Sequence, residues 1–384
     1  MKIAIINLTA GGMSGGYQKY LINVLPRMAM HSDVESILCA SPKSINVQNW
    51  FSFLPNVKFV ICNPYNFLNF IPDYKFIKIL KIFSPDVIFI PVGRYFKFDR
   101  IPIVNMIQGM ESFAENLDEN FVSESCRLYA KHILVKKAIK NSDRVIAISR
   151  YVKEFLLHKW NVLEEKIVLV YHGVESPQLK EYVRPNNIPK EWEENFLFTA
   201  GSIRPARGLK DILGAMKYLV LEKINIKGLV IAGETELKMI PYRKKLEEWV
   251  KMNKLSSKIC WTGKLNQKEI GWCYRNCKIF VMTSRVEACP NIVLEAMSYG
   301  CISVSSTNPP LPEIFGDTAI YYPPKNEKLL AETIKSVNMW NNHQFGEASK
   351  KARERALKFS WDITIERLLA EFKKAINDYK LIQE

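Results

Sequence analysis

The chain has 384 residues and a mass of 44.4 kDa, which is too long for one ordinary hydrophobic core and suits two domains of roughly 150–200 residues. Its 48 % hydrophobic and 24 % charged residues form a globular composition that excludes a wholly disordered chain. The net charge of +15 favours an anionic partner such as nucleic acid, nucleotide phosphates or acidic lipid, although a basic solvated surface also explains it.

No apolar run reaches the roughly 18–20 residues of a membrane helix, and the first twelve residues, MKIAIINLTAGG, are typical of a first strand and not of a signal peptide. We therefore expect a cytoplasmic protein. Eight cysteines are scattered along the chain, and nothing near Cys273 and Cys277 completes a zinc site. These two residues are expected to be reduced and structural.

Short apolar runs alternate with helical patterns, which is typical of parallel sheets built from βαβ units. In the first half we expect a helix at 16–31, kinked or ended early by Pro26, and strands at 2–8, 34–39, 57–62, 87–91, 103–107, 144–148 and 167–170. In the second half we expect strands at 197–200, 228–232, 259–262, 279–282, 302–305 and 319–322. The polar, Pro-rich segment 176–195 predicts a linker, and the chain ends in a helix at about 361–381.

These elements predict an α/β protein with two Rossmann-like domains. The expected domains are 1–184 and 185–360. In such folds ligands bind at the carboxyl ends of the strands, so we expect the site in a cleft between the two domains.

The strongest candidate motif holds two glutamates, Glu287 and Glu295, just after the strand at 279–282. Pro290 and Asn291 suit a helix start, which places Glu287 in a loop and Glu295 about one turn into the helix. The first helical turn offers N–H groups for a diphosphate, and the carboxylates suit ribose and sugar hydroxyls. A single acidic residue near a helix start can also simply complement the helix dipole. The prediction of a binding site therefore depends on the presence of both glutamates.

A second motif, GSIRPARG at 201–208, follows the strand at 197–200. Arg204 and Arg207 are expected to project from this loop, where guanidinium groups stabilise phosphate charge through two hydrogen bonds each. Isolated loop arginines are more often simply solvated, so their position after a strand is what favours a functional role.

A glycine-rich loop, with glycines at 11, 12, 15 and 16, separates the first strand from the first helix and lets the backbone approach a ligand. The chain lacks Asp-x-Asp, GxxxxGK[ST] and GxGxxG motifs, which disfavours a carboxylate-held metal–diphosphate, a P-loop NTPase and a dinucleotide dehydrogenase. His172 follows a strand and either faces the cleft or is an ordinary loop histidine.

Together these residues resemble the retaining glycosyltransferases of family 4, which have the GT-B architecture. The Glu-x7-Glu motif formed by Glu287 and Glu295 is the most specific match. Further similarity lies at 11–16, 142–149, 170–175, 201–212, 231–233, 295–306, 312–315 and 359–369.

The resemblance implies that Glu295 binds the nucleotide ribose, that Glu287 binds the donor sugar, and that Arg204 and Arg207 stabilise the diphosphate. It implies further donor contacts from Gly15, Gly16, Gly201, Ser202, Cys289, Pro290, Asn291 and Ile292. In this family the first domain serves the acceptor and the second the donor. The resemblance also implies that the last helix, at 361–384, crosses back and completes the first domain. A phosphate oxygen is the base, and attack comes from the face that the nucleotide leaves.

Two departures from the family pattern concern the site. The family usually has Arg after the first glycine of the phosphate loop and Lys near its end, where this chain has Ser202 and Arg207, and Arg204 is a candidate to compensate. A histidine commonly ends the strand at 103–107, where Gln108 stands here. Gln108 and His172 are therefore the candidates for an acceptor or sugar contact.

The resemblance implies a retaining, metal-independent transferase that needs no cofactor and moves a hexose from a UDP- or GDP-sugar to a glycan or lipid-linked saccharide in cell-surface polysaccharide synthesis. A sugar phosphorylase on the same fold and a non-catalytic nucleotide- or nucleic-acid-binding protein remain alternatives. No nucleic-acid partner is expected, because the basic residues lack an aromatic-interleaved patch. Lysines at 75, 78, 81, 131, 136, 137 and 140 add the hypothesis of peripheral contact with an anionic inner membrane face, against the simpler explanation of solvated helices.

Overall fold

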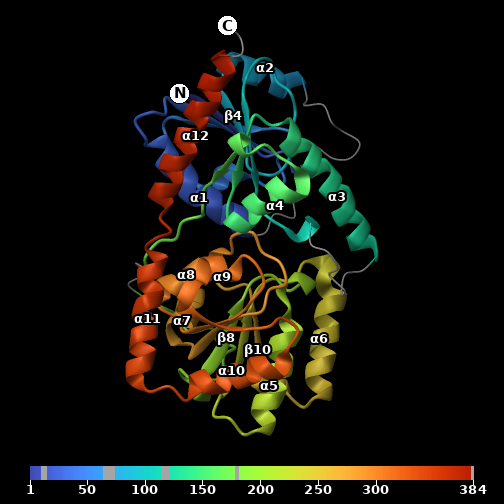
Figure 1. The fold of residues 1–384 in the computed structure, drawn as a ribbon, viewed down its shortest axis with the longest axis vertical. Coiled ribbons are helices and arrows are strands. Elements are labelled where there is room, and N and C mark those ends of the chain that lie inside the picture. The colour runs from blue at the N-terminus through green and yellow to red at the C-terminus, as the bar shows by residue number, and fades with distance from the viewer. Residues whose placement is uncertain (10–14, 64–73, 114–121, 178–180, 382–384) are drawn as a thin grey trace. The chain divides into compact units, whose positions relative to one another are not determined.

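The computed structural model describes residues 1–9, 15–63, 74–113, 122–177 and 181–381. Contacts divide the chain into two compact units. The first unit contains the described parts of Met1–Phe113, Val122–Gly173 and Trp361–Glu384, and the second unit contains those of Val174–Ser360. Both units are α/β layers around a parallel sheet (Figure 1).

The sheet of the first unit has seven strands in the order β3-β2-β1-β4-β5-β6-β7, all parallel. Its strands are β1 (Lys2–Ile6), β2 (Ser36–Ser41), β3 (Val57–Ile61), β4 (Val87–Ile90), β5 (Ile103–Ile107), β6 (Arg144–Ala147) and β7 (Ile167–Leu169). Every strand expected in this half is confirmed. The central strands are buried throughout, as continuous apolar runs require when helices cover both faces of a sheet.

The helices of the first unit are α1 (Gly15–Ala29), α2 (Tyr74–Phe83), α3 (Val122–Asn141), α4 (Arg150–Trp160) and α12 (Trp361–Leu381). Helix α1 buries its apolar stripe and continues through Pro26 to Ala29. Helix α4 begins after Ser149, whose side chain accepts a hydrogen bond from the Val152 N–H and caps the helix.

Helix α12, the last helix of the described chain, belongs to the first unit, as the family resemblance implies. It lies alongside α1 (Figure 1), and its Phe372 ring packs 5.2 Å from that of Phe89 in β4. The guanidinium of Arg144, only 7 % exposed, forms ion pairs with Glu371 at 3.1 Å and Asp378 at 2.6 Å. The end of the chain therefore completes both the core and the charge balance of the first unit.

The sheet of the second unit has six parallel strands in the order β10-β9-β8-β11-β12-β13. Its strands are β8 (Phe196–Ala200), β9 (Gly228–Ala232), β10 (Ile259–Gly263), β11 (Ile279–Met282), β12 (Ser303–Ser306) and β13 (Ala319–Tyr322), again as predicted. Its helices are α5 (Leu209–Leu221), α6 (Ile240–Met252), α7 (Gln267–Asn276), α8 (Asn291–Tyr299), α9 (Leu311–Phe315), α10 (Glu327–Asn338) and α11 (Asn342–Ala356). Helices α5 and α10 lie side by side (Figure 1).

The segment expected to be a linker packs largely on the second unit. The Val183 N–H donates to the Lys268 carbonyl at 3.3 Å, and the Tyr182 ring meets that of Tyr299 edge-on at 6.1 Å. Trp192 is buried and lies against Gly228. The two units therefore divide after residue 173, earlier than residue 184, because these buried aromatic contacts offset the polar, Pro-rich composition of the segment.

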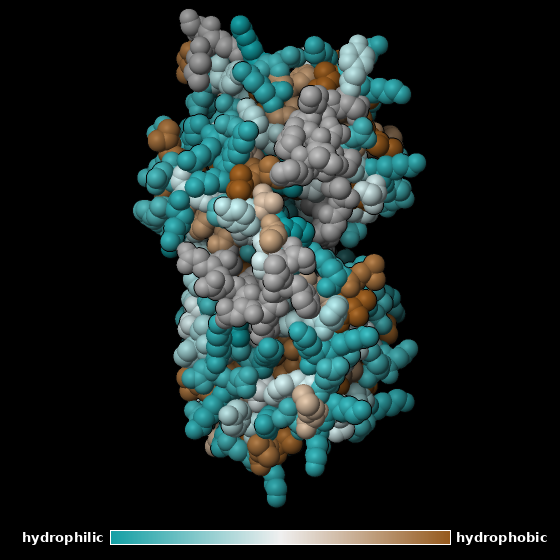
Figure 2. Space-filling view, turned by 90° about the vertical axis from the view of Figure 1, so that its right-hand side faces the viewer, coloured by the Kyte–Doolittle hydropathy of each residue, from teal (hydrophilic) through white to brown (hydrophobic). Residues whose placement is uncertain are grey.

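None of the helices in the described ranges combines the length and the low polarity needed to cross a bilayer. On the face drawn in Figure 2, hydrophilic side chains predominate and hydrophobic ones are scattered among them.

Candidate functional site

The predicted motifs lie at the switch point of the second sheet. Strands β8 and β11 are neighbours, and from this pair the sheet grows through β9 and β10 on one side and through β12 and β13 on the other. A crevice forms at the carboxyl ends of such a strand pair, because the chain leaves the two strands in opposite directions. The loops that follow β8 and β11 here are 201–208 and 283–290.

Hydrogen bonds join these two loops. The Arg285 N–H donates to the Ala206 carbonyl at 2.8 Å, and the Thr283 hydroxyl donates to the Arg207 carbonyl at 2.7 Å. Gly208 has a φ of +60°, and a Cβ at this position would lie 2.3 Å from the Thr283 carbonyl oxygen, so only glycine allows this close approach. The two loops therefore form one continuous surface.

On this surface Arg207 and Glu287 form an ion pair. Their side chains are only 15 % and 14 % exposed, and the Arg207 Nη1 also lies 3.3 Å from the Ser284 hydroxyl oxygen. Partial burial lowers the local dielectric, so the two groups interact more strongly than a solvated pair would. The structure thus brings together two of the predicted catalytic residues from different loops.

The Arg207 side chain occupies the space beside Gly201 that a larger residue at this position would fill. The φ of Gly201 is +122°, and a Cβ would lie 2.7 Å from the Arg207 Nε.

We expect Gly201→Ala to lower the free energy of unfolding by about 1–3 kcal/mol, because alanine would be strained at this φ and would push against the guanidinium. Urea unfolding measures the change, with Gly346→Ala as a control. A Cβ at Gly346 meets nothing within 4 Å, and alanine is the better residue inside helix α11. Equal stability of the two variants would contradict the packing of Arg207 on Gly201.

Helix α8 begins as the sequence predicts. Pro290 is its N-cap residue and provides no side-chain hydrogen bond, while its carbonyl accepts a hydrogen bond from the Val293 N–H at 3.0 Å. Glu287 lies in the loop before the helix and Glu295 about one turn inside it. Cys289 is buried and Ile292 half-buried.

The carboxylate of Glu295 accepts a hydrogen bond from the Tyr274 hydroxyl at 3.0 Å. Tyr274 lies on α7, is buried, and was not singled out by its sequence context. Burial raises the pKa of its phenol well above the ordinary value, so the hydroxyl keeps its proton and acts as the donor.

A buried ion pair fixes the loop after β11. The Arg285 guanidinium donates to both oxygens of Asp211, at 2.7 and 2.5 Å. Asp211 is only 2 % exposed and also accepts hydrogen bonds from the Tyr322 hydroxyl and the Lys325 N–H, each at 2.9 Å. Because Glu287 follows Arg285 by two residues, this network positions the loop that carries Glu287.

The other predicted residues of the second unit lie in the same loops. Ser202 and Arg204 are half-buried in the loop after β8, and the Arg204 carbonyl accepts a hydrogen bond from the Arg207 N–H at 3.0 Å. Asn291 is the first residue of α8.

Four predicted residues belong to the first unit. Gly15 and Gly16 begin α1, and a Cβ at Gly15 would meet nothing within 4 Å. Gln108 is half-buried just after β5, with its amide nitrogen 3.6 Å from the Met106 sulfur. His172 is buried, with its ring 5.2 Å from that of Tyr20 and 5.8 Å from that of Trp361, so it packs in an aromatic cluster. Glycines 11 and 12 lie outside the described residues.

A pocket of about 570 Å³ opens at the same edge of the second sheet, after β9 and β10. Its lining includes Gly233, Glu234 and Trp261, and the Arg243 guanidinium stacks 3.6 Å from the Trp261 ring centre. The pocket is large enough for a planar heterocycle.

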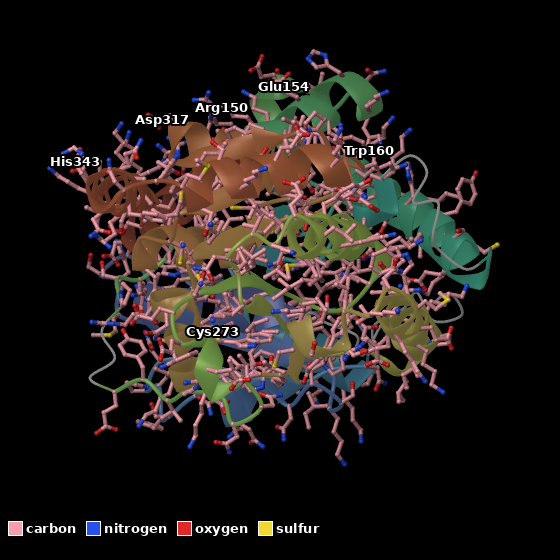
Figure 3. All side chains as sticks on the ribbon, turned by 90° about the horizontal axis from the view of Figure 1, so that it is seen from below. Arg150, Glu154, Trp160, Cys273, Asp317 and His343 are labelled. Carbon is pink, nitrogen blue, oxygen red and sulfur yellow. The ribbon has the colours of Figure 1, made fainter. Side chains whose placement is uncertain are left out.

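The described residues contain no group of three or more His, Cys, Asp or Glu side chains arranged to hold a metal ion. Cys273 is buried on α7, whereas His343 lies at the surface on α11 (Figure 3).

Two protein families match the chain. Residues 182–356 match the family described as Glycosyl transferases group 1, and residues 14–176 match Glycosyltransferase Family 4. An uncharacterized glycosyltransferase of Methanocaldococcus jannaschii is 26 % identical over 267 residues, which are 66 % of this chain and 64 % of the relative. The O-antigen chain mannosyltransferase RfbU of Salmonella typhimurium is 23 % identical over 204 residues, 53 % of each chain. The matched segments thus span only 53–64 % of these relatives.

The crystal structure of HepE from Anabaena in complex with UDP-glucose has a TM-score of 0.72 to this chain at 16 % identity, covering 97 % of this chain and 100 % of HepE. This likeness concerns the fold. With one family matching each half and two parallel α/β sheets, the resemblance drawn from the sequence is confirmed: the chain belongs to glycosyltransferase family 4 and has the GT-B fold.

Proposed function

We propose that this chain is a retaining, metal-independent hexosyltransferase that uses a UDP- or GDP-sugar as donor and a hydroxyl of a saccharide or lipid-linked saccharide as acceptor. The observation that carries the proposal is the Arg207–Glu287 pair at the switch point of the second sheet, in the loops that lead into α5 and α8. HepE, solved with UDP-glucose, and RfbU, an O-antigen chain mannosyltransferase, support a nucleotide-sugar donor and a role in polysaccharide synthesis.

The proposed chemistry depends on where negative charge develops during the transfer. Breaking the anomeric C–O bond leaves negative charge on the diphosphate, and preorganised donors at that position lower the barrier. In the proposed complex the guanidinium groups of Arg204 and Arg207 and the N–H groups at the start of α8 receive this charge. Glu287 holds hydroxyls of the donor sugar and Glu295 those of the ribose. The pocket after β9 and β10 receives the nucleobase of the donor.

Retention requires the acceptor to attack from the face that the nucleotide leaves. We assign the deprotonation of the acceptor hydroxyl to a phosphate oxygen of the donor, as in the family. The acceptor side is assigned to the first unit, with Gln108 as its sugar contact. His172 is left out of this assignment because its ring is packed between Tyr20 and Trp361.

Thermal-shift measurements with UDP, GDP and their sugar conjugates test the proposal, because a ligand that binds only the folded state raises the melting temperature by mass action. We expect one nucleotide family to stabilise the protein, and sugar transfer from that donor to persist in EDTA. Absence of any shift, loss of activity in EDTA, or turnover that depends on inorganic phosphate, as in a phosphorylase, would each contradict it.

We further propose that the first unit contacts anionic membrane. Helix α2 exposes Tyr74 and Ile82 beside three exposed lysines, and α3 exposes Tyr129 and Ile133 on a lysine-rich helix. Apolar and cationic side chains on one surface helix suit the interface of an acidic bilayer.

Flotation with liposomes, with and without acidic lipid and across a salt series, tests this contact. We expect binding only to acidic liposomes at low salt, and weaker binding after Lys75→Glu, Lys78→Glu and Lys81→Glu together. No binding at low salt would refute it.

A further inference from the structure

The hydroxyl of Tyr274 lies between two acceptors on α8. It is 3.0 Å from Glu295 Oε2 and 3.4 Å from the carbonyl oxygen of Ile292. A tyrosine hydroxyl has one proton to donate, and the carboxylate is both the nearer and the more strongly accepting group. Ile292 and Glu295 are three residues apart and therefore share one face of the helix. The hydroxyl thus lies against the face that carries Glu295.

The position of this hydroxyl is set by aromatic packing. Helices α7 and α8 lie side by side (Figure 1), and the Tyr274 ring stacks on that of Tyr299 at 5.3 Å. Its ring also meets Phe198 of β8 edge-on at 5.2 Å and Phe280 of β11 at 5.8 Å. The ring is therefore held by the two strands that form the switch point, so its hydroxyl is a fixed donor.

We propose that Tyr274 is a positioning residue for ribose recognition, holding the Glu295 carboxylate in the orientation that accepts the hydroxyls of the donor's ribose. This inference rests on the proposed function. A glutamate side chain has three rotatable bonds, and ordering them on binding reduces affinity unless they are fixed beforehand. A carboxylate has about four lone-pair positions, so the bond from Tyr274 can fix the group while it also binds ribose.

The test measures affinity for UDP, 2′-deoxy-UDP, GDP and 2′-deoxy-GDP by calorimetry, in the wild type and in Tyr274→Phe. We expect the wild type to bind the ribonucleotide about tenfold more tightly than the 2′-deoxy form with the same nucleobase. A factor of this size corresponds to the free energy of one hydrogen bond to a charged group. In Tyr274→Phe this preference is expected to fall to about threefold, and affinity for the ribonucleotide to fall about fivefold. In sugar-transfer assays of Tyr274→Phe, we expect the KM for the donor to rise and kcat to stay within about twofold of the wild type. This result is typical of losing an interaction that is equally strong in the ground state and the transition state.

Tyr299→Phe is the matched control, because it removes a hydroxyl from the same aromatic stack without touching Glu295. It should leave the ribose preference unchanged. A second measurement combines Tyr274→Phe with Glu295→Ala. In the Glu295→Ala background, Tyr274→Phe should change the affinity for the ribonucleotide by less than about twofold, because the carboxylate that Tyr274 positions is gone.

An unchanged ribose preference in Tyr274→Phe, an equal loss in Tyr299→Phe, or an additive effect in the double variant would overturn the positioning role while leaving the proposed function intact. A wild type that binds neither UDP nor GDP would instead refute the proposed function, and with it this inference.

Discussion

Replacing Arg207 by alanine is expected to reduce kcat for sugar transfer about 100- to 1000-fold, the usual effect of removing one preorganised donor from a developing oxyanion. The side chain is well placed for this role, because Gly201 lies against it on one side and Glu287 and Ser284 contact its end. Steady-state kinetics with the donor identified by thermal shift measures the effect.

Arg207→Lys is the informative companion to this variant. It keeps the positive charge but loses the planar pair of N–H donors, so we expect a smaller loss than in Arg207→Ala. Because Arg207 and Glu287 act as one unit, Arg207→Ala combined with Glu287→Ala should be little slower than the worse single variant. Turnover within threefold of the wild type in both single alanine variants would contradict the assigned site.

The largest loss of stability is expected from Asp211→Ala. It leaves the guanidinium of Arg285, 16 % exposed, without its carboxylate and removes the acceptor of Tyr322 and Lys325. Breaking a buried ion pair from one side costs about 3–5 kcal/mol, and for a unit of this size each kcal/mol lowers the melting temperature by about 2–4 °C. Calorimetry should therefore show the second unit melting roughly 6–20 °C lower.

Asp317→Ala serves as the control, since Asp317 is an exposed aspartate of the same unit (Figure 3) and surface substitutions usually stay within about 0.5 kcal/mol. Below its melting temperature Asp211→Ala should also lose activity, because the loop that carries Glu287 is no longer held by Arg285. A melting temperature within 2 °C of the wild type's would show that the pair does not fix this loop.

Most of the fold could be predicted from the sequence, because the signals are local. Most strands of the two sheets are short apolar runs, as is typical of parallel strands covered on both faces, although β12 (SVSS) has only one apolar residue. The positions of Glu287 in a loop and Glu295 in a helix also followed from local sequence, since Pro290 and Asn291 mark the start of α8.

The partners of these residues could not be predicted in the same way. Arg207 and Glu287 are 80 positions apart and meet only because β8 and β11 become neighbours in the sheet. Asp211 has the pattern of an ordinary acidic residue in a first helical turn, and its ion pair with Arg285 depends on the same strand order. Tyr274 has the pattern of a buried helical aromatic, and only its hydroxyl contact distinguishes it.

The segment after residue 173 shows the opposite limitation of local sequence patterns. Its composition indicated a linker, yet Tyr182 and Trp192 pack on the second unit. These contacts join the segment to distant parts of the chain, and a local pattern contains no information on such contacts.

The return of α12 to the first unit has a consequence for biosynthesis. Arg144 in β6 finds its carboxylates, Glu371 and Asp378, only after residues 174–360 have left the ribosome. At about 5–20 residues per second this takes between roughly 10 and 40 seconds. During that interval the nascent first unit lacks the Phe372 ring that packs on β4 and the two carboxylates that pair with Arg144. All residues of the second unit are therefore synthesised before the first unit can be completed.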